Sequence, residues 1–288
     1  MTAETWTPQR AANRLVKLTQ AVSAAHRLER FPVDVPQLAL ETANIFGWSD
    51  PITSVQAANI KGFDGALFPG DGRKEWLLLY NESVTSRGRV RFTQAHELGH
   101  YILHRHQRED FQCSDDDMHN WTQDEKDIEG QADLFASYLL MPLDDYRIQV
   151  GTCAVDLDVL AHCADRYGVS LTAAILKWLQ YTSEKAVVVV SRDGFIDWAW
   201  SSEPAAKAGA FFRTKSSVIA VPAKSLAANE AVKHSRMGEQ LAANIWFAHA
   251  HPSTPVREMK LTADQYGSIV TLLHLPPSAE AWPPWERE

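Results

Sequence analysis

A short histidine-rich run, RFTQAHELGHYILHRH at residues 91–106, limits what this chain can fold into more than any other feature. His96 and His100 are four residues apart, and Glu97 directly follows the first of them. On a helix, residues four apart lie one above the other on one face, so both imidazoles can reach one cation. Glu97 then lies about 100° further round the axis, close enough to hold a water bound to that cation. The spacing therefore predicts a metal site on a helix.

The third protein ligand of such a site has two candidates, because catalytic zinc is usually held by three side chains and a water. His106 stands six residues after His100, as in H-E-x-x-H-x-x-G-x-x-H enzymes, but Leu103 replaces the glycine that turns the chain there. Glu129 lies on the next predicted helix, and Asp133 follows it by four residues, on the same face. Glu129 can complete the site while Asp133 holds a histidine ring from behind. The sequence favours Glu129 over His106.

Periodicity predicts a largely helical first part and a more extended second part. Helices are expected over 8–29, from about Pro36 to Gly47 with Asp34 as the cap, over 88–104, over 125–140, and as a pair within 156–181 joined at 168–170. A hairpin is expected from 66–68 and 76–80, and a surface loop over the acid-rich segment 107–127. Strands are expected at 186–190, 195–200 and 218–222. We therefore place a domain boundary between residues 182 and 183.

The bulk properties are those of an ordinary globular protein. The chain has 288 residues, 45% of them hydrophobic, which is enough for a sizeable core, and its net charge of −8 argues against broad nucleic-acid binding. The N-terminus lacks an apolar signal region and no stretch approaches ~18 apolar residues, so we expect a soluble, cytoplasmic protein without a membrane partner. Cys113, Cys153 and Cys163 form no C-x-x-C pair and are expected to be reduced thiols.

Other polar clusters have simpler interpretations. His104 and His106 are typical of residues at a helix C-terminus, where a positive charge is favourable. His249 and His251 could form a second metal pair, but their alternation also suits a strand with one polar face, which we favour. The Asp115–Asp117 run is expected to be a solvated loop, because a calcium site needs a fuller set of ligands.

Residues 157–178 have the pattern of a helix-turn-helix, with Gly168, Val169 and Ser170 at the turn. A DNA-reading helix usually carries several side chains that contact bases and phosphates. Here the exposed positions of the second helix offer little beyond Lys177, and Arg166 is the other basic group. We therefore expect this segment to support the fold, and DNA binding by this chain is not expected.

Four segments together resemble the ImmA/IrrE family of metallopeptidases: FPVDVPQLA, GFDGALF, RFTQAHELGHYILH and EGQADLFASYLLMP, in this order. The resemblance covers about residues 10–182 and implies a zinc peptidase core similar to that of thermolysin. By position it implies His96, His100 and Glu129 as metal ligands and Glu97 as the catalytic base. The family often has Asn where this chain has Asp133, and a carboxylate can make the same hydrogen bond.

The resemblance also implies a fold and a function. We expect an α+β protein with a mainly helical zincin-like peptidase domain at 1–182, including a small β-sheet and the helix-turn-helix-like segment 156–181, and a smaller sensory or substrate-holding domain at 183–288. The implied activity is zinc-dependent cleavage of a helix-turn-helix repressor, which induces stress-response or mobile-element genes. Zinc suits two histidines and a glutamate, with manganese as a competitor. The alternative is a non-catalytic, metal-binding regulator that binds a repressor or antitoxin; the oligomeric state stays open.

Overall fold

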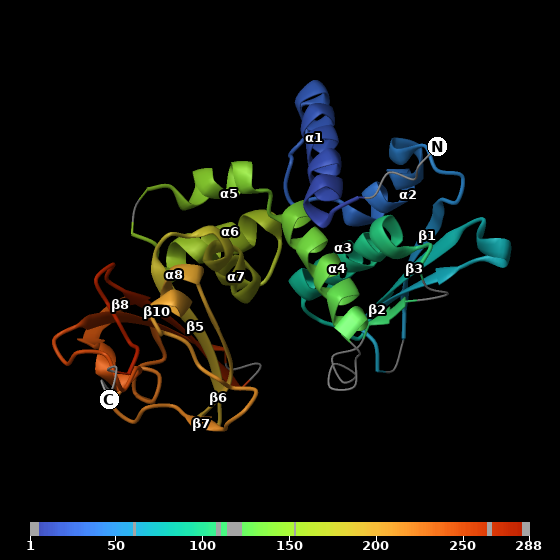
Figure 1. Ribbon diagram of the computed structural model, residues 1–288. Helices are drawn as coiled ribbons and strands as arrows, with labels where there is room; N and C mark the ends of the chain where they lie inside the picture. Colours follow the sequence, from blue (N-terminus) through green and yellow to red (C-terminus); the bar gives the residue numbers. More distant parts are fainter. Residues whose placement is uncertain are drawn as a thin grey trace, which may run out of the picture. The chain divides into compact units, whose positions relative to one another are not determined.

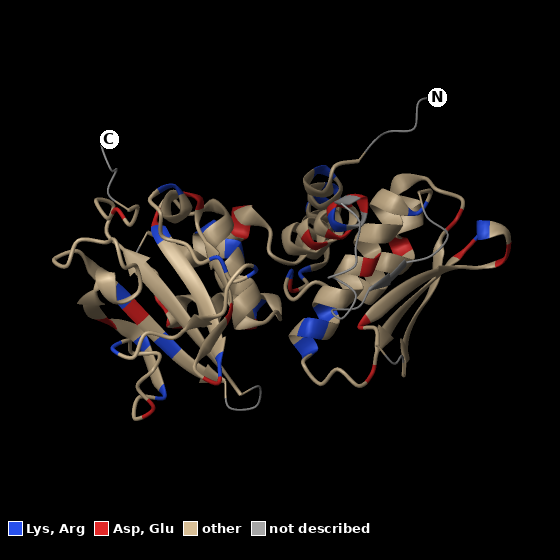
Figure 2. Cartoon of the chain, turned by 60° about the horizontal axis from the view of Figure 1, so that its bottom comes forward, with Lys and Arg blue, Asp and Glu red and all other residues tan. Residues whose placement is uncertain are grey.

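The computed structural model describes residues 6–59, 62–107, 111–113, 123–152, 154–263 and 267–283 (Figure 1). The chain divides into two compact units, Met1–Gln149 with Ala164–Ser170, and Val150–Cys163 with Leu171–Glu288. Helices dominate the first unit and a six-stranded sheet forms the second, so the expected α+β class is confirmed. Acidic and basic residues are interspersed along both units (Figure 2).

The first unit contains a four-stranded sheet in the order β1-β3-β2-β4. Its strands are β1 (Ile52–Ala58), β2 (Gly65–Pro69), β3 (Trp76–Asn81) and β4 (Phe111–Cys113). β2 and β3 form the expected antiparallel hairpin around the short 3-10 helix Asp71–Arg73, whereas β1 runs parallel to β3. β4 pairs with β2, so the prediction of one continuous loop over 107–127 is wrong at residues 111–113.

The helices of the first unit begin and end close to their predicted positions. They are α1 (Pro8–His26), α2 (Val35–Phe46), α3 (Arg87–His104), α4 (Gln123–Leu140) and α5 (Leu143–Val150), of which α5 was not predicted. The Asp34 side chain accepts a hydrogen bond from the Gln37 amide at 3.1 Å, and Gly47 ends α2 with φ of 73°. These are the expected caps, since a carboxylate satisfies free amides at a helix start and glycine adopts the left-handed conformation easily.

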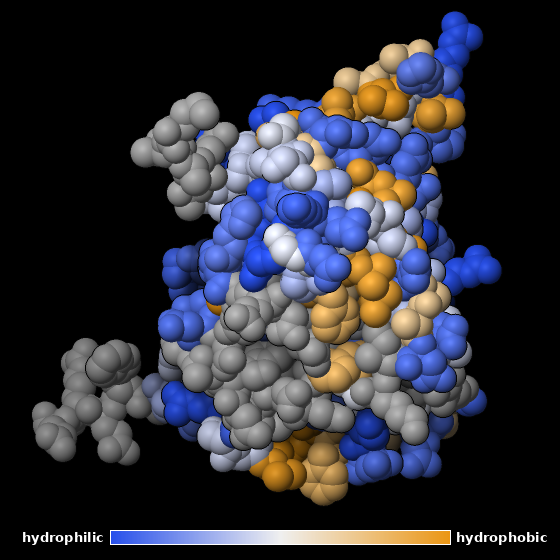
Figure 3. Space-filling model, turned by 90° about the vertical axis from the view of Figure 1, so that its right-hand side faces the viewer, coloured by the Kyte–Doolittle hydropathy of each residue, from blue (hydrophilic) through white to orange (hydrophobic). Residues whose placement is uncertain are grey.

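α1 is only partly covered. Its first half buries Ala11, Ala12 and Leu15 completely, and the helix packs against α4. In its second half, Leu18 is 39% and Val22 is 45% exposed. Apolar side chains accordingly reach the surface near the top of the view in Figure 3.

The second unit is built on an antiparallel sheet in the order β7-β6-β5-β10-β9-β8. Its strands are β5 (Lys185–Arg192), β6 (Phe195–Ser201), β7 (Ile219–Ala220), β8 (His234–Ala242), β9 (Pro255–Ala263) and β10 (Ser268–Leu275). An apolar cluster that includes Val187, Val189, Trp246, Phe247 and Leu273 forms one core of this unit, to which the short helix α8 (Glu203–Lys207) contributes Ala205. The expected strand at 218–222 is reduced to two residues.

The predicted helix pair is α6 (Leu157–Tyr167) and α7 (Leu171–Tyr181), joined at Gly168 with φ of 63°. Trp178 of α7 packs edge-on against the His274 ring of β10, with the ring centroids 6.3 Å apart. The expectation for His249 and His251 is wrong, because both lie in a turn region after the 3-10 helix Ala243–Ile245 and not in a strand. His251 Nδ1 is bonded there to the Ser253 hydroxyl at 2.7 Å.

Candidate metal centre

A close approach of α3 and α4 creates the site. A Cβ atom at Gly99 would lie 3.0 Å from Cδ1 of Phe135 and 3.2 Å from Cα of Ala132. Because glycine faces alanine at this crossing, the two helix backbones can pack more closely than larger side chains would allow. The contact brings Glu129 of α4 beside the two histidines of α3.

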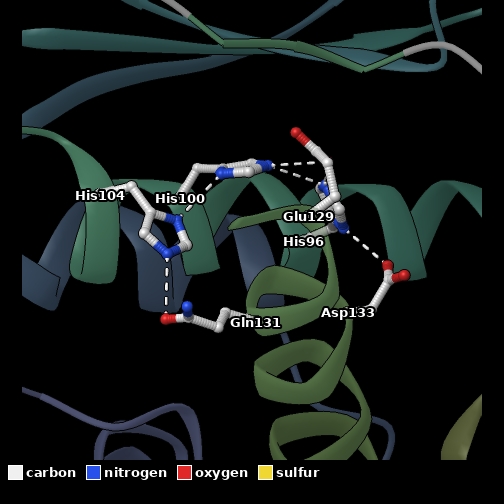
Figure 4. A network of polar contacts seen from close by, with 6 residues as sticks. All are labelled: His96, His100, His104, Glu129, Gln131 and Asp133. Atoms are coloured by element: carbon white, nitrogen blue, oxygen red, sulfur yellow. Dashed lines mark hydrogen bonds and ion pairs between the residues drawn. The ribbon is translucent and has the colours of Figure 1, made fainter. Parts of the chain in front are cut away.

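Three donor atoms meet at one point (Figure 4). Nε2 of His96 lies 2.9 Å from Oε2 of Glu129, and Nε2 of His100 lies 3.2 Å from the same oxygen. The two Nε2 atoms are 2.9 Å apart. Donor atoms around a tetrahedral zinc with bonds of about 2.0–2.1 Å lie about 3.3 Å from one another. The spacing therefore fits a single ion of that size, with a small outward movement of the side chains.

The charge states also suit a metal. Burial lowers the pKa of His100 to about 4, so this imidazole is neutral at physiological pH. Burial alone would raise the pKa of Glu129, but its contacts with His100 and His96 outweigh burial, and the pKa lies well below its usual range. A neutral imidazole and an ionised carboxylate are the forms that bind a cation.

Asp133 contacts the outer side of the first histidine, where the sequence placed it. Its Oδ1 lies 2.9 Å from Nδ1 of His96, while Nε2 of that ring faces the donor cluster. His106 is exposed beyond the end of α3 and lies outside the cluster. In the described part of the chain, His96, His100 and Glu129 are the one group of three His, Cys, Asp or Glu residues whose ligand atoms lie within 4.8 Å of one another.

Glu97 lies against strand β2 and is fully buried. A Cβ atom at Gly65 would lie 2.8 Å from Oε1 of Glu97 and 2.4 Å from Cγ2 of Thr93. Since distances below 3.0 Å are essentially never seen for real Cβ atoms, any larger residue at position 65 would force Glu97 or Thr93 to shift. Gly65 was part of the recognised GFDGALF segment, yet nothing in the sequence showed that it lies beside Glu97.

The structure also corrects the expectation for His104. It was predicted to be an ordinary residue at the helix end, but it is 1% exposed. Its Nδ1 lies 3.1 Å from Nδ1 of His100, and its Nε2 lies 3.4 Å from Oε1 of Gln131 (Figure 4). The four-residue spacing from His100 was a usable signal for this contact, whereas Gln131 carried none.

The two basic groups of the helix-turn-helix-like segment are both engaged or buried. Arg166 forms two hydrogen bonds with the Asp145 carboxylate, at 2.7 and 2.9 Å. Lys177 was expected to be exposed, but it is 1% exposed because its position on α7 faces the interior. Asp115–Asp117, Cys153 and most of the 107–127 segment lie outside the described residues, while Cys163 is a buried free thiol.

None of the helices in the described ranges is both long and apolar enough to cross a membrane. A comparison with curated proteins finds no match. Among solved structures, a Mycobacterium tuberculosis transcriptional regulator aligns over 94% of this chain and 82% of its own, with 12% sequence identity and a TM-score of 0.47.

A family model described as the IrrE N-terminal-like domain, a peptidase family, matches residues 50–179. The matched range includes the whole of α3 and α4, and therefore all three members of the donor cluster. The resemblance indicated by the sequence motifs is thus confirmed: residues 50–179 match the model of the IrrE N-terminal-like peptidase family.

Proposed function

We propose that this chain is a zinc-dependent endopeptidase in which His96, His100 and Glu129 hold the metal. The observation that carries the proposal is the convergence of two Nε2 atoms and one carboxylate oxygen within 3.2 Å of one another, one residue away from a second glutamate. Two imidazoles and one carboxylate leave a fourth position for water, which is the arrangement of catalytic zinc sites. Manganese also accepts carboxylate ligands and is the alternative metal.

The chemistry follows from the residues. A bound divalent ion would lower the pKa of its water to near neutral, and the ion itself would polarise the carbonyl group of the substrate. Glu97 follows His96 directly on α3, and we assign it the role of general base, which accepts the proton of the attacking water and passes it to the leaving amine. Gly65 supports this role because its missing side chain leaves space for the Glu97 carboxylate.

The proposed substrate is a repressor protein. The family links such a peptidase domain to regulation of a repressor, and we propose a helix-turn-helix repressor as the protein that is cleaved. Cleavage in the cytoplasm would induce stress-response or mobile-element genes. The second unit would then sense a signal or hold the substrate, since a narrow specificity draws binding energy from regions away from the cut bond.

The test compares the wild-type protein with Glu97→Gln. Glutamine fills the same space but cannot accept the proton, so the variant should bind one zinc per chain and lose cleavage by about 10²–10⁴-fold, as is typical when an acid–base group is removed. Each protein is incubated with candidate repressors and with casein, and the products are mapped by mass spectrometry.

Cleavage of one repressor at one or a few bonds, with casein largely intact, would support a selective peptidase. Equal cleavage by both proteins would remove Glu97 from the mechanism. Inactivation of a repressor by wild type and variant alike, without a cleaved product, would favour the non-catalytic regulator.

A further inference from the structure

We infer that His104 and Gln131 form a hydrogen-bonded chain that holds His100 in the tautomer whose Nε2 lone pair faces the metal. This inference rests on the proposed function, because it takes His100 as a ligand. It assigns a positioning role to two residues outside the cluster of donor atoms.

The contact between the two rings requires a defined placement of protons. Nδ1 of His100 and Nδ1 of His104 are 3.1 Å apart. In neutral imidazoles one nitrogen carries a proton and the other accepts, so this contact works only if one of the two Nδ1 atoms donates to the other. The two possible directions have opposite consequences for the metal.

Gln131 selects the direction that favours binding. Its Oε1 lies 3.4 Å from Nε2 of His104, so this ring nitrogen donates to the amide oxygen. Nδ1 of His104 is then the acceptor, and Nδ1 of His100 donates to it. Nε2 of His100 consequently carries no proton and offers its lone pair towards Glu129 and His96. The reverse direction would place a proton on the atom that must bind the ion.

The hydrogen-bonded residues lie in a buried row of histidines. His96, His100 and His104 follow one another along α3, with ring centroids 4.6 and 5.3 Å apart. His100 is fully buried and His104 is 1% exposed, so bulk water has no access to this contact. His96 is oriented differently, by Asp133, whose side chain is 59% exposed. The two ligand rings are thus held by different chemistry, a carboxylate for one and a second imidazole with an amide for the other.

Three full-length variants test the inference. His104→Leu fills much of the space but accepts no hydrogen bond, His104→Asn retains an acceptor close to the position of Nδ1, and the exposed His106→Leu is the matched control. Zinc affinity is measured by competition with a chelator, and urea unfolding of the metal-free proteins monitors the fold. We expect His104→Leu to weaken binding about 10- to 100-fold, as is usual when an orienting partner of a ligand is lost. His104→Asn should recover part of this loss, and His106→Leu should bind like the wild type.

A second measurement reads the tautomers directly. Long-range proton–nitrogen spectra of the wild-type protein with ¹⁵N-labelled histidine should show the proton of His104 on Nε2 and that of His100 on Nδ1. Gln131→Leu should weaken zinc binding in the same direction as His104→Leu.

The outcomes separate this inference from the proposed function. Wild-type zinc affinity in His104→Leu, or a proton on Nδ1 of His104, would overturn the positioning role while the metal site stands. Equal weakening in the Asn and Leu variants would also overturn it, because the loss would then be one of packing. A wild-type protein that binds no zinc would overturn both.

Discussion

Each unit of this protein holds a glutamate that is largely shielded from solvent, half-buried Glu129 in the first and fully buried Glu258 in the second, and the two carboxyl groups behave in opposite ways. In the first unit, contacts with two histidines outweigh burial and keep the pKa of Glu129 well below its usual range. In the second unit, burial raises the pKa of Glu258, and hydrogen bonds from Trp246 and the Ala227 amide offset it only in part. The surroundings of a buried acid, more than burial itself, decide whether it is available to bind a cation.

The second unit uses its buried charges to hold a loop. Glu258 Oε2 accepts a hydrogen bond from Nε1 of Trp246 at 2.7 Å, and its Oε1 accepts one from the Ala227 amide at 2.6 Å. Lys260 Nζ donates to the carbonyl oxygens of Leu226 and Asn229, at 3.2 and 2.8 Å. Acidic and basic residues therefore lie within the strands of this sheet (Figure 2) without forming a site, because their atoms are turned towards backbone and indole groups. A site needs donor atoms that converge on one another, as in the first unit.

Proteolytic cleavage of the chain gives the most direct test of whether the two parts are separate domains. We predict that limited proteolysis cleaves near Thr182–Lys185 and releases a stable N-terminal fragment that still binds zinc. Gly151 and Thr152, in the connection between α5 and α6, are exposed as well. A first cut there would move the boundary to the start of α6, close to Gln149, where the main segment of the first compact unit ends. Gel electrophoresis and mass spectrometry locate the cuts. Cuts scattered through both halves would contradict the separation into domains.

The two glutamates themselves give the next largest contrast. Glu129→Leu should weaken zinc binding by more than about 100-fold, since losing a ligand costs at least as much as losing its orienting partner. Glu258→Leu should leave zinc affinity unchanged and lower the free energy of unfolding by about 1–3 kcal/mol for each donor left without its acceptor. Chelator competition and urea unfolding of both variants measure the two effects. A loss of zinc affinity in Glu258→Leu would mean that the two units are not independent.

Much of the first unit was predictable because its signals are local. The caps at Asp34 and Gly47, the hairpin of β2 and β3, and the four-residue spacing of His96 and His100 are set by neighbouring residues in the chain. The donor cluster also brings Glu129 to α3 from another helix, and the spacing of polar residues on that helix was enough to indicate it. Strand β4 was missed because three residues in an acidic segment carry no period.

The remaining misses depend on contacts between distant segments. Gly65 has ordinary backbone angles, so its role arises only from the approach of Glu97 and Thr93. His104 and Lys177 are polar residues at helix positions that could face either way, and only packing decides that both are buried. Sequence periodicity assigns a polar residue to the surface by default, which is why buried functional histidines are easily overlooked.

A single added atom at Gly65 tests how closely the position of Glu97 is defined. Gly65→Ala adds a Cβ that must displace Glu97 or Thr93, so we expect cleavage to fall about 100-fold while zinc stays bound, as for an error of about 1 Å in the position of a reacting group. Gly130→Ala in α4 is the matched control, because nothing lies within 4 Å of an added Cβ there. That variant should keep full activity and gain up to about 1 kcal/mol in stability. Loss of zinc in Gly65→Ala would instead place the clash on the ligands.

The smallest predicted effect concerns Lys177 of the second unit. Burial lowers the pKa of this lysine to about 7, whereas an unfolded chain has the ordinary value near 10.5. Between these two pH values the unfolded chain holds more protons than the folded one, so stability rises with pH across this window, and the cost of burying the charge is largest below pH 7. Lys177→Met should therefore raise the free energy of unfolding by about 1–2 kcal/mol at pH 6.5, with a gain that shrinks as the pH approaches 10.

Lys207→Met is the control, since that side chain is 75% exposed and should change stability by less than about 0.5 kcal/mol. Urea unfolding at several pH values measures the difference. A gain that stays constant with pH would show that packing of the methionine, and not the buried charge, stabilises the variant. A loss of stability would show that Lys177 contributes contacts of the kind that hold Glu258 and Lys260, and the second unit would then contain a third buried charge that supports the fold.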